Sequence, residues 1–299
     1  MEDKTTKSQA NDKWLFGKYL DKEAQEAKLG IFYSIAGGRA GRPLVLPLAA
    51  ADSPARVRSE LMNSGADMDY LGANRAQQQD QLSIHLDPSN LHVGIYARKM
   101  GWVEGRFITP TSLRGGNCDV IVESSILELS VTFHGKAGKL ADWRRQVAKP
   151  AQKSSAASFA ILLALSAPLL GRVAEGEEGF IVNLAGDSSI GKTAALMAGQ
   201  SLTGPGSELM SWASTSRALA EQAAALSDIF LPIDDLDKVS NTRSFGRLFT
   251  ELTHMLVSGE SKAYSRAVQD RLPDLKWSCV AMTGGRTTVE EMTNYRREC

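Results

Sequence analysis

Cysteine is scarce in this sequence of 299 residues, and the cysteines that occur follow no recognisable spacing. Cys118, Cys279 and Cys299 are far apart in the chain and form no CxxC motif. This pattern argues against a disulfide framework and a zinc ribbon, and it favours a protein of the reducing cytoplasm. The four histidines also lack HExxH spacing, so we expect no metal centre built on histidine.

Long hydrophobic runs are missing as well. The N-terminal segment, MEDKTTKSQANDK, has no apolar core and therefore does not resemble a secretory signal. The longest apolar stretch, residues 156–170, contains Ser158, Ser166 and Pro168 and is shorter than the ~18 residues that a membrane span needs. We therefore predict a buried helix over residues 159–170 and no membrane association.

An excess of either charge is absent, because 34 Lys and Arg residues balance 34 Asp and Glu residues. Any attraction to nucleic acid must therefore come from a local patch. Residues 136–153 form such a patch, with six basic residues against one acid, Asp142. We favour the solvated face of a short linker helix around Trp143, and the alternative is contact with a nucleic-acid backbone. The basic residues are Lys136, Lys139, Arg144, Arg145, Lys149 and Lys153.

The length fits one large domain or two of ordinary size, and the residue pattern favours two. Residues 1–28 are rich in charge and poor in large apolar side chains, which predicts a charged extension outside the core. Short β-type runs over residues 29–135 predict a mixed, β-rich N-terminal module. Residues 136–153 are then a basic linker, and residues 154–299 form the second domain.

Within the first module the sequence predicts a hairpin followed by a helix. Residues 31–35 and 44–48 are β-type runs separated by a glycine-rich turn. Ser53 is placed to cap a helix that begins at Pro54 and ends at Gly65. Its apolar face holds Val57, Leu61 and Met62. Further strands are expected at residues 92–96, 106–109 and 120–131.

Helices and strands alternate from residue 154 onward, which is typical of an α/β domain with a parallel sheet. The expected helices are residues 159–170, 192–202, 215–226 and 245–256. The expected strands are residues 180–184 and 228–233, and residues 262–268 and 275–282 are read as a further strand pair. The fold class predicted for this half is a three-layer α/β/α domain.

Residues 186–193, with the sequence GDSSIGKT, match the pattern GxxxxGK[ST] at every fixed position. The expected strand before the motif and the helix after it supply the context of a phosphate-binding loop, or P-loop. Successive backbone N–H groups and the positive end of the helix dipole can meet the charge of a phosphate chain. We predict that ATP is bound by Gly186, Asp187, Ser188, Ser189, Ile190, Gly191, Lys192 and Thr193.

The chemistry of a P-loop assigns roles to its last two residues and to an acidic partner. Lys192 is expected to reach the β- and γ-phosphates, and the Thr193 hydroxyl to ligate Mg²⁺. Asp234 and Asp235, at the end of the strand expected at residues 228–233, fit the acidic partner on a neighbouring strand. Asp234 is predicted to hold the Mg²⁺ shell and Asp235 to orient water, although its side chain is one methylene shorter than the glutamate often found there. The alternative is a solvated turn.

Together these residues resemble the mobile-element and phage proteins known as "superfamily II helicases and inactivated derivatives", whose P-loop domain is AAA+-like. The resemblance covers roughly residues 40–285. Its ordered series includes the P-loop and the segments Leu44–Pro47, Gly101–Trp102, Phe107–Pro110, Leu140–Trp143, Ala167–Leu170 and Ser211–Trp212 with Thr215.

The resemblance implies an ATPase that acts on DNA and assembles as a homo-oligomeric ring, with six subunits as one form. It implies that Thr283 senses the γ-phosphate or the attacking water, and a strand-end threonine without that role is the alternative. Residues 262–276 would be a hairpin facing DNA, and Arg266 or Arg271 would be the arginine finger, unless both are solvated. Gly285 stands where the family commonly carries an acid, and Asp235 where it carries a glutamate.

Two functions from different classes follow. The first is a helicase-like ATPase acting on DNA in the replication or transfer of a mobile element or phage. The second is a nucleotide-binding module for DNA binding or assembly, with weak or absent hydrolysis. A small-molecule kinase also uses a P-loop, but the sequence shows no motif for an acceptor site.

Overall fold

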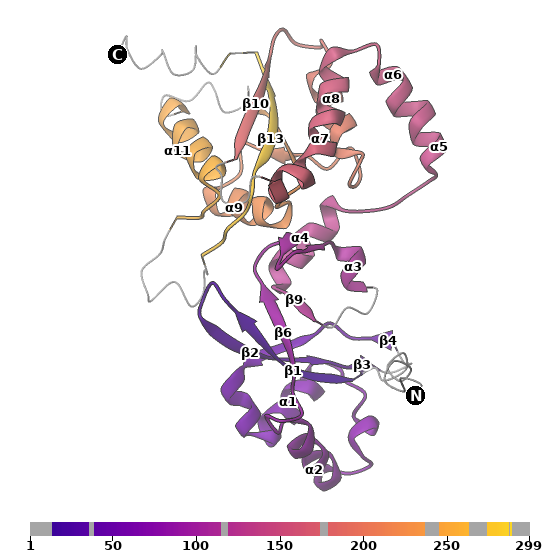
Figure 1. The fold of residues 1–299 in the computed structure, drawn as a ribbon, viewed down its shortest axis with the longest axis vertical. Helices are drawn as coiled ribbons and strands as arrows, with labels where there is room; N and C mark the ends of the chain where they lie inside the picture. Colours follow the sequence, from indigo (N-terminus) through magenta and orange to yellow (C-terminus); the bar gives the residue numbers. More distant parts are fainter. Residues whose placement is uncertain are drawn as a thin grey trace, which may run out of the picture. The chain divides into compact units, whose positions relative to one another are not determined.

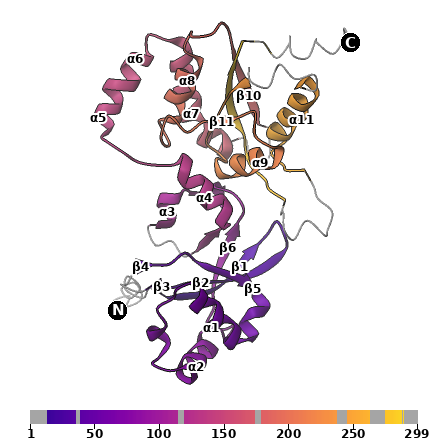
Figure 2. The same ribbon diagram turned by 180° about the vertical axis from the view of Figure 1, so that it is seen from behind.

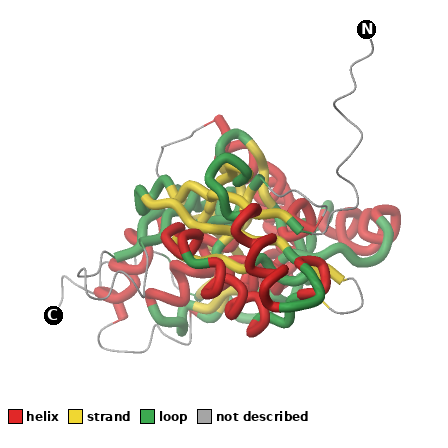
Figure 3. Tube along the Cα trace, turned by 90° about the horizontal axis from the view of Figure 1, so that it is seen from below, coloured by secondary structure: helices red, strands yellow, loops and turns green. Residues whose placement is uncertain are grey.

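The computed structural model describes residues 14–35, 39–114, 119–173, 179–236, 245–262, 274–286 and residue 288. Helices and strands alternate with loops through these ranges (Figure 3). The chain divides into two compact units (Figure 1). The first comprises Met1–Ala97 and Leu113–Ile121, and the second comprises Arg98–Ser112 and Val122–Cys299. The chain changes unit within helix α3 (Pro110–Arg114) and within strand β9 (Val120–Val122).

The first unit is a five-stranded mixed sheet with helices against it. The strand order is β5-β2-β1-β6-β9, in which β1 is antiparallel to β2 and parallel to β6. The other elements are β1 (Leu15–Asp21), β2 (Glu26–Phe32), β3 (Ser34–Ile35), β4 (Arg39–Ala40), β5 (Leu44–Pro47), α1 (Pro54–Asn63), α2 (Arg75–His85), β6 (His92–Ala97) and the short 3₁₀ helices η1 (Leu48–Asp52) and η2 (Met68–Leu71).

The sheet of the first unit is built around residues that were expected to lie outside the core. Trp14 and Phe16 are buried with Ile31, Val57 and Leu61 in one apolar cluster. The prediction that residues 1–28 form a charged extension is therefore wrong for the described part of that range, which supplies β1 and part of β2. β1 itself contains two charged residues, Lys18 and Asp21, but the charges on either side of it dominate the composition of residues 1–28, so average composition hid the strand.

Three other predictions for this half are corrected in part. The predicted hairpin exists, but β2 pairs with β5 over residues 28–31 and 44–47, and Ser34–Ile35 pair instead with Arg39–Ala40. The helix from Pro54 is also confirmed, but Met62 is half exposed rather than buried. The strand predicted over residues 120–131 is wrong beyond Val122, where helix α4 (Ser124–Phe133) begins.

The second unit holds a four-stranded parallel sheet of order β10-β13-β12-β11. Figures 1 and 2 show α7 and α8 on one side of it and α9 and α11 on the other. Its strands are β7 (Gly101–Val103), β8 (Arg106–Ile108), β10 (Phe180–Ala185), β11 (Met210–Ser211), β12 (Phe230–Asp234) and β13 (Val280–Gly285). Its helices, besides α4, are α5 (Leu140–Trp143), the π-helical η3 (Arg144–Ala148), α6 (Lys149–Ala151), α7 (Ser155–Val173), α8 (Lys192–Gln200), α9 (Ser216–Ala225) and α11 (Phe245–Ser258).

Helix α7 supports the sheet with one face only. Ala160, Leu163 and Ala167 are buried in a cluster with Phe230 and Met282 of the sheet. The opposite face is exposed, so the predicted buried helix is buried along one stripe, and the exposed residues are Phe159, Leu162, Leu165, Leu169 and Val173. By length and composition alone α7 could also cross a membrane, which is weak evidence for a helix that packs on a sheet.

The division into units differs from the boundary that composition suggested at residues 136–153. The hairpin of β7 and β8 belongs to the second unit, and so does α4, which packs against α9. Both segments precede the basic linker, so the second unit begins well before residue 136. Composition marks the basic segment, but packing of the β7–β8 hairpin on α7 and of α4 on α9 decides which residues belong to the second unit.

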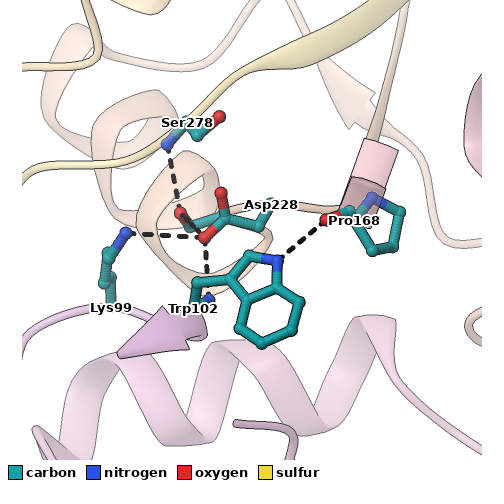
Figure 4. A network of polar contacts seen from close by, with 6 residues as sticks. Lys99, Trp102, Pro168, Asp228 and Ser278 are labelled. Atoms are coloured by element: carbon teal, nitrogen blue, oxygen red, sulfur yellow. Dashed lines mark hydrogen bonds and ion pairs between the residues drawn. The ribbon is translucent and has the colours of Figure 1, made fainter. Parts of the chain in front are cut away.

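The amino ends of the strands in the second unit are joined by a buried polar network around Asp228 (Figure 4). Its carboxylate accepts a hydrogen bond of 2.8 Å from the Trp102 backbone N–H and pairs with the Lys99 ammonium at 3.4 Å. Asp228 N–H donates to the carbonyl of Ser278, just before β13. Trp102 Nε1 also donates to the carbonyl of Pro168 in α7. This network fixes the β7–β8 hairpin, α7 and the sheet to one another.

Candidate functional site at the carboxyl ends of the strands

The predicted site residues gather at the carboxyl end of the parallel sheet. Strand β13 lies between β10, which leads into the P-loop, and β12, which ends at Asp234. Thr283 of β13 is in register with Asn183 of β10 and with Ile233 of β12. Neighbouring strands lie about 4.8 Å apart, so β12 lies roughly 10 Å from β10. The acidic strand is therefore not the immediate neighbour that the sequence suggested, and β13 intervenes.

The P-loop is an exposed turn in which three residues have positive φ angles. Gly186 has φ +155°, Ser189 φ +65° and Gly191 φ +95°. A Cβ added to Gly191 would contact no atom within 4 Å. Glycine is therefore favoured at this position by the positive φ angle and not by close packing. Residues 187–191 are exposed, which leaves the loop accessible to a ligand from solvent.

Lys192 and Thr193 begin helix α8 directly after the loop. The Lys192 ammonium donates to the carbonyls of Gly186 and Asp187, at 2.7 Å each, so its charged end lies over the turn. Gly284 of β13 backs onto Lys192, where an added Cβ would lie 3.1 Å from the lysine Cβ. Thr193 is exposed in the first helical turn, where the helix dipole favours an anion.

The acidic pair lies where β12 ends. Both side chains are partly buried, and Asp235 has φ +66°, a conformation that costs energy for a residue other than glycine. The Ser211 hydroxyl donates to Asp235 Oδ2 at 3.2 Å, and the Asp234 carbonyl accepts from the Trp212 N–H. The end of β11 thus holds both aspartates in place.

Thr283 lies inside the second unit, beneath the ends of the strands. It is fully buried, and its hydroxyl accepts a hydrogen bond of 2.7 Å from Trp212 Nε1. Trp212 is itself buried against Phe249 of α11. Sequence analysis noted Trp212 only as part of a resemblance, whereas the structure makes it the common partner of β11, β12 and β13.

Arg286 is a site residue that sequence analysis missed. It follows Gly285 at the end of β13, and its guanidinium donates from Nε to the Ser188 hydroxyl of the P-loop at 2.9 Å. A second guanidinium nitrogen contacts the same hydroxyl. Its position three residues after Thr283 was the available signal, because the carboxyl end of a strand beside a P-loop faces the loop.

The predicted DNA-facing hairpin is described only at its base. Glu260 pairs with Lys276 in an antiparallel bridge, and Ser261 N–H donates to the Leu275 carbonyl. Lys262 forms an ion pair with Glu251 at 3.4 Å. Arg266 and Arg271, the candidate arginine fingers, lie outside the described residues.

The basic segment carries its positive charges on the outside, although Ala151 within it is buried. The side chains of its six basic residues all face solvent. Arg145 pairs with Asp142, while Trp143 Nε1 donates to the Ser201 hydroxyl at the end of α8. This tryptophan holds the segment to the second unit, so its charges are carried on an ordered surface.

Among the described residues there is no group of three or more His, Cys, Asp or Glu side chains suited to a metal. The ligands that the sequence predicts for Mg²⁺ are one hydroxyl and one carboxylate. That donor set fits Mg²⁺ bound with a nucleotide, because this ion keeps water and phosphate ligands and needs only one or two from protein. Thr193 and Asp234 remain the residues predicted to supply them.

Comparison with known proteins places the sequence in a family. A family model described as "Domain of unknown function (DUF927)" matches residues 17–270. The chain belongs to this family. No curated protein matches.

A solved structure shows the same fold. The chain titled "SCCmec type IV Cch - active helicase" is similar with a TM-score of 0.59 and 16% sequence identity. The alignment covers 93% of this chain and 51% of that one, so the present chain spans about half the length of the structure it matches. The fold is therefore mixed α/β and like that of a helicase from a mobile element.

Proposed function

We propose that this protein binds ATP with Mg²⁺ through its P-loop and hydrolyses it to act on DNA in the replication or transfer of a mobile element or phage. The observation that carries the proposal is the arrangement at the carboxyl ends of β10 and β12. A complete GxxxxGK[ST] turn follows one strand, and an aspartate ends another in register with it. The fold shared with a chain titled as an active helicase supports the same conclusion.

Two of the predicted residues, Lys192 and Asp235, have contacts that support their proposed roles. The Lys192 ammonium already lies over the turn, so it can neutralise phosphate oxygens held by the backbone of residues 186–191. Bound Mg²⁺ would supply a positive charge that orients the terminal phosphate and offsets its negative charge. Asp235 would hold the attacking water, with its carboxylate fixed by Ser211.

DNA would be met by exposed positive charge on the second unit. The basic segment over residues 136–153 is one candidate surface, and the hairpin that the sequence predicts over residues 262–276 is the other. Either would bind the nucleic-acid backbone rather than its bases, and binding would then weaken steeply with salt. We further propose a homo-oligomeric ring, with Arg266 or Arg271 as finger, in the cytoplasm.

A second function is favoured by a specific observation. The Asp235 carboxylate is short and accepts a hydrogen bond from Ser211, which competes with its use as a base. A nucleotide-binding module for DNA binding or assembly, with slow hydrolysis, would use the same P-loop. The variant Asp235→Glu separates the two functions. If hydrolysis is slow because the aspartate carboxylate is too short to contact the attacking water, the longer glutamate should raise turnover.

The test combines nucleotide binding with turnover. Wild type should bind a fluorescent ATP analogue with Mg²⁺, and Lys192→Ala should lose that binding while remaining folded. Asp234→Asn should lose Mg²⁺-dependent turnover, measured with and without single-stranded DNA. Wild type that binds no nucleotide would refute the proposal. Binding without turnover in both wild type and Asp235→Glu would favour the second function.

A further inference from the structure

Arg286 contacts the P-loop, but the proposed function gives it no role. It is exposed, it lies at the carboxyl end of β13, and its guanidinium contacts the hydroxyl of Ser188 through two nitrogens. Ser188 belongs to the turn that would surround a phosphate chain. The positive charge of Arg286 therefore lies in direct contact with that turn.

The alternation of β13 accounts for the placement. Val280 and Met282 point into the cluster formed with α7 and α8, and Gly284 backs onto Lys192. Even-numbered residues of β13 therefore face the P-loop and α8, and Arg286 continues that series. Thr283 belongs to the odd-numbered series and faces Trp212 on the other side of the sheet.

The chemistry of the group favours an anionic ligand over the contact with Ser188. A guanidinium presents several N–H donors in a planar fork, which matches two oxygens of a phosphate. The Ser188 hydroxyl offers one neutral oxygen to two of those donors. Hydrogen bonds to a charged acceptor are roughly twice as strong as those to a neutral one.

We propose that Arg286 binds the phosphate chain of the nucleotide from within the same subunit, as a second cation beside Lys192. This inference rests on the proposed ATP binding. It assigns to Arg286 the contact from β13 that the family resemblance gave to Thr283. Thr283 is then a positioning residue, because its buried hydroxyl fixes the indole of Trp212 between the strands.

The proposal is tested by titrating a fluorescent ATP analogue with Mg²⁺ into variants of the full chain. Arg286→Ala and Arg286→Gln should both raise the dissociation constant about tenfold, as expected for a lost charge-assisted hydrogen bond. Arg286→Lys should recover part of the affinity, since it keeps the charge without the fork. The melting temperature without nucleotide should stay at the wild-type value because the side chain is exposed.

Two matched controls complete the experiment. Arg145→Ala removes an exposed arginine on the basic segment and should bind within twofold of wild type. Ser188→Ala removes the contacted hydroxyl of the loop, and its loss of affinity should be smaller than that of Arg286→Ala. Arg286→Ala that binds like Arg145→Ala, while Lys192→Ala is impaired, would overturn this inference and leave the proposed function standing. An equal loss in Ser188→Ala would assign the effect to loop geometry and also overturn it. Failure of wild type to bind would instead refute the proposed function.

Discussion

The two ends of the parallel sheet use similar residues in opposite ways. At the amino ends, Asp228 is buried and its carboxylate is held by Lys99, Trp102 and Ser227. At the carboxyl ends, the P-loop is exposed and Lys192 donates to two carbonyls of its own turn. Asp228 and Asp235 both have φ near +60°, so an unusual backbone conformation alone does not mark a functional site.

The contrast between Asp228 and Lys192 indicates that the surroundings of a charged group decide whether it stabilises the fold or binds a ligand. A charge buried among fixed partners cannot meet a ligand, and removing it leaves those partners unsatisfied. A charge held at an exposed turn can exchange its partners for a ligand at little cost. We therefore expect substitutions at the amino ends to change stability and substitutions at the carboxyl ends to change binding.

The largest effect is expected at Asp228. Asp228→Ala leaves the Trp102 N–H and the Lys99 ammonium without their acceptor, and should lower the free energy of unfolding by about 3 kcal/mol or more. Urea unfolding followed by circular dichroism measures it. Asp142→Ala is the control, since this acid is about half exposed in its pair with Arg145, and it should change stability by under about 0.5 kcal/mol. A loss under 1 kcal/mol for Asp228→Ala would show that the network is not a structural anchor.

A smaller loss of stability is expected at Trp212, which is buried beneath the carboxyl ends of the strands. Trp212→Phe keeps an aromatic ring against Phe249 but removes the donor to Thr283, so stability should fall by about 1 kcal/mol. Thr283→Val removes the acceptor. A double-mutant cycle of urea unfolding should give a coupling energy of about 1 kcal/mol between the two positions. Strictly additive losses would contradict the positioning role of Thr283.

The smallest effect at neutral pH is expected at Cys279, just before β13. Burial raises the pKa of its thiol from 9.0 to about 12. The unfolded thiol ionises as pH rises above about 9, while the folded one stays neutral, so this group's contribution to stability is present below pH 9 and lost toward pH 12. In a chain with Cys118 and Cys299 replaced by serine, a thiol reagent at pH 8 should react only after denaturant is added. Rapid reaction of the folded protein would show that the strand opens readily.

The sequence predicted the second unit better than the first. The P-loop, its strand and its helix were found because a motif with fixed glycines and a lysine specifies local backbone conformation. Strand β1 was missed because the charged residues around it gave the range the composition of an extension, and only its pairing with β2 and β6 shows that it belongs to the sheet. Helix α4 was read as a strand because its β-type residues, among them Ile126, Val131 and Phe133, follow closely on the apolar run of β9.

The sequence predicted which residues form the candidate site, but not how the strands that carry them are ordered in the sheet. Sequence analysis named Lys192, Asp234 and Thr283, yet it had no means to place β13 between β10 and β12. Strand order is set by packing between distant segments, so Arg286 and Trp212 became site residues only in three dimensions. The burial of Thr283 likewise follows from Trp212, more than seventy residues earlier.

The most direct test of the account compares two lysines, one from each end of the sheet. Lys192→Met and Lys99→Met remove the same charge with a similar side-chain length, and each variant is assayed for unfolding in urea and for binding of a fluorescent ATP analogue with Mg²⁺. Lys192→Met should lose at least tenfold in affinity with stability within about 0.5 kcal/mol of wild type. Lys99→Met should lose about 1 to 2 kcal/mol of stability and bind the nucleotide normally while folded. Normal binding by Lys192→Met, or lost binding by folded Lys99→Met, would contradict the assignment of chemistry to the carboxyl ends and structure to the amino ends.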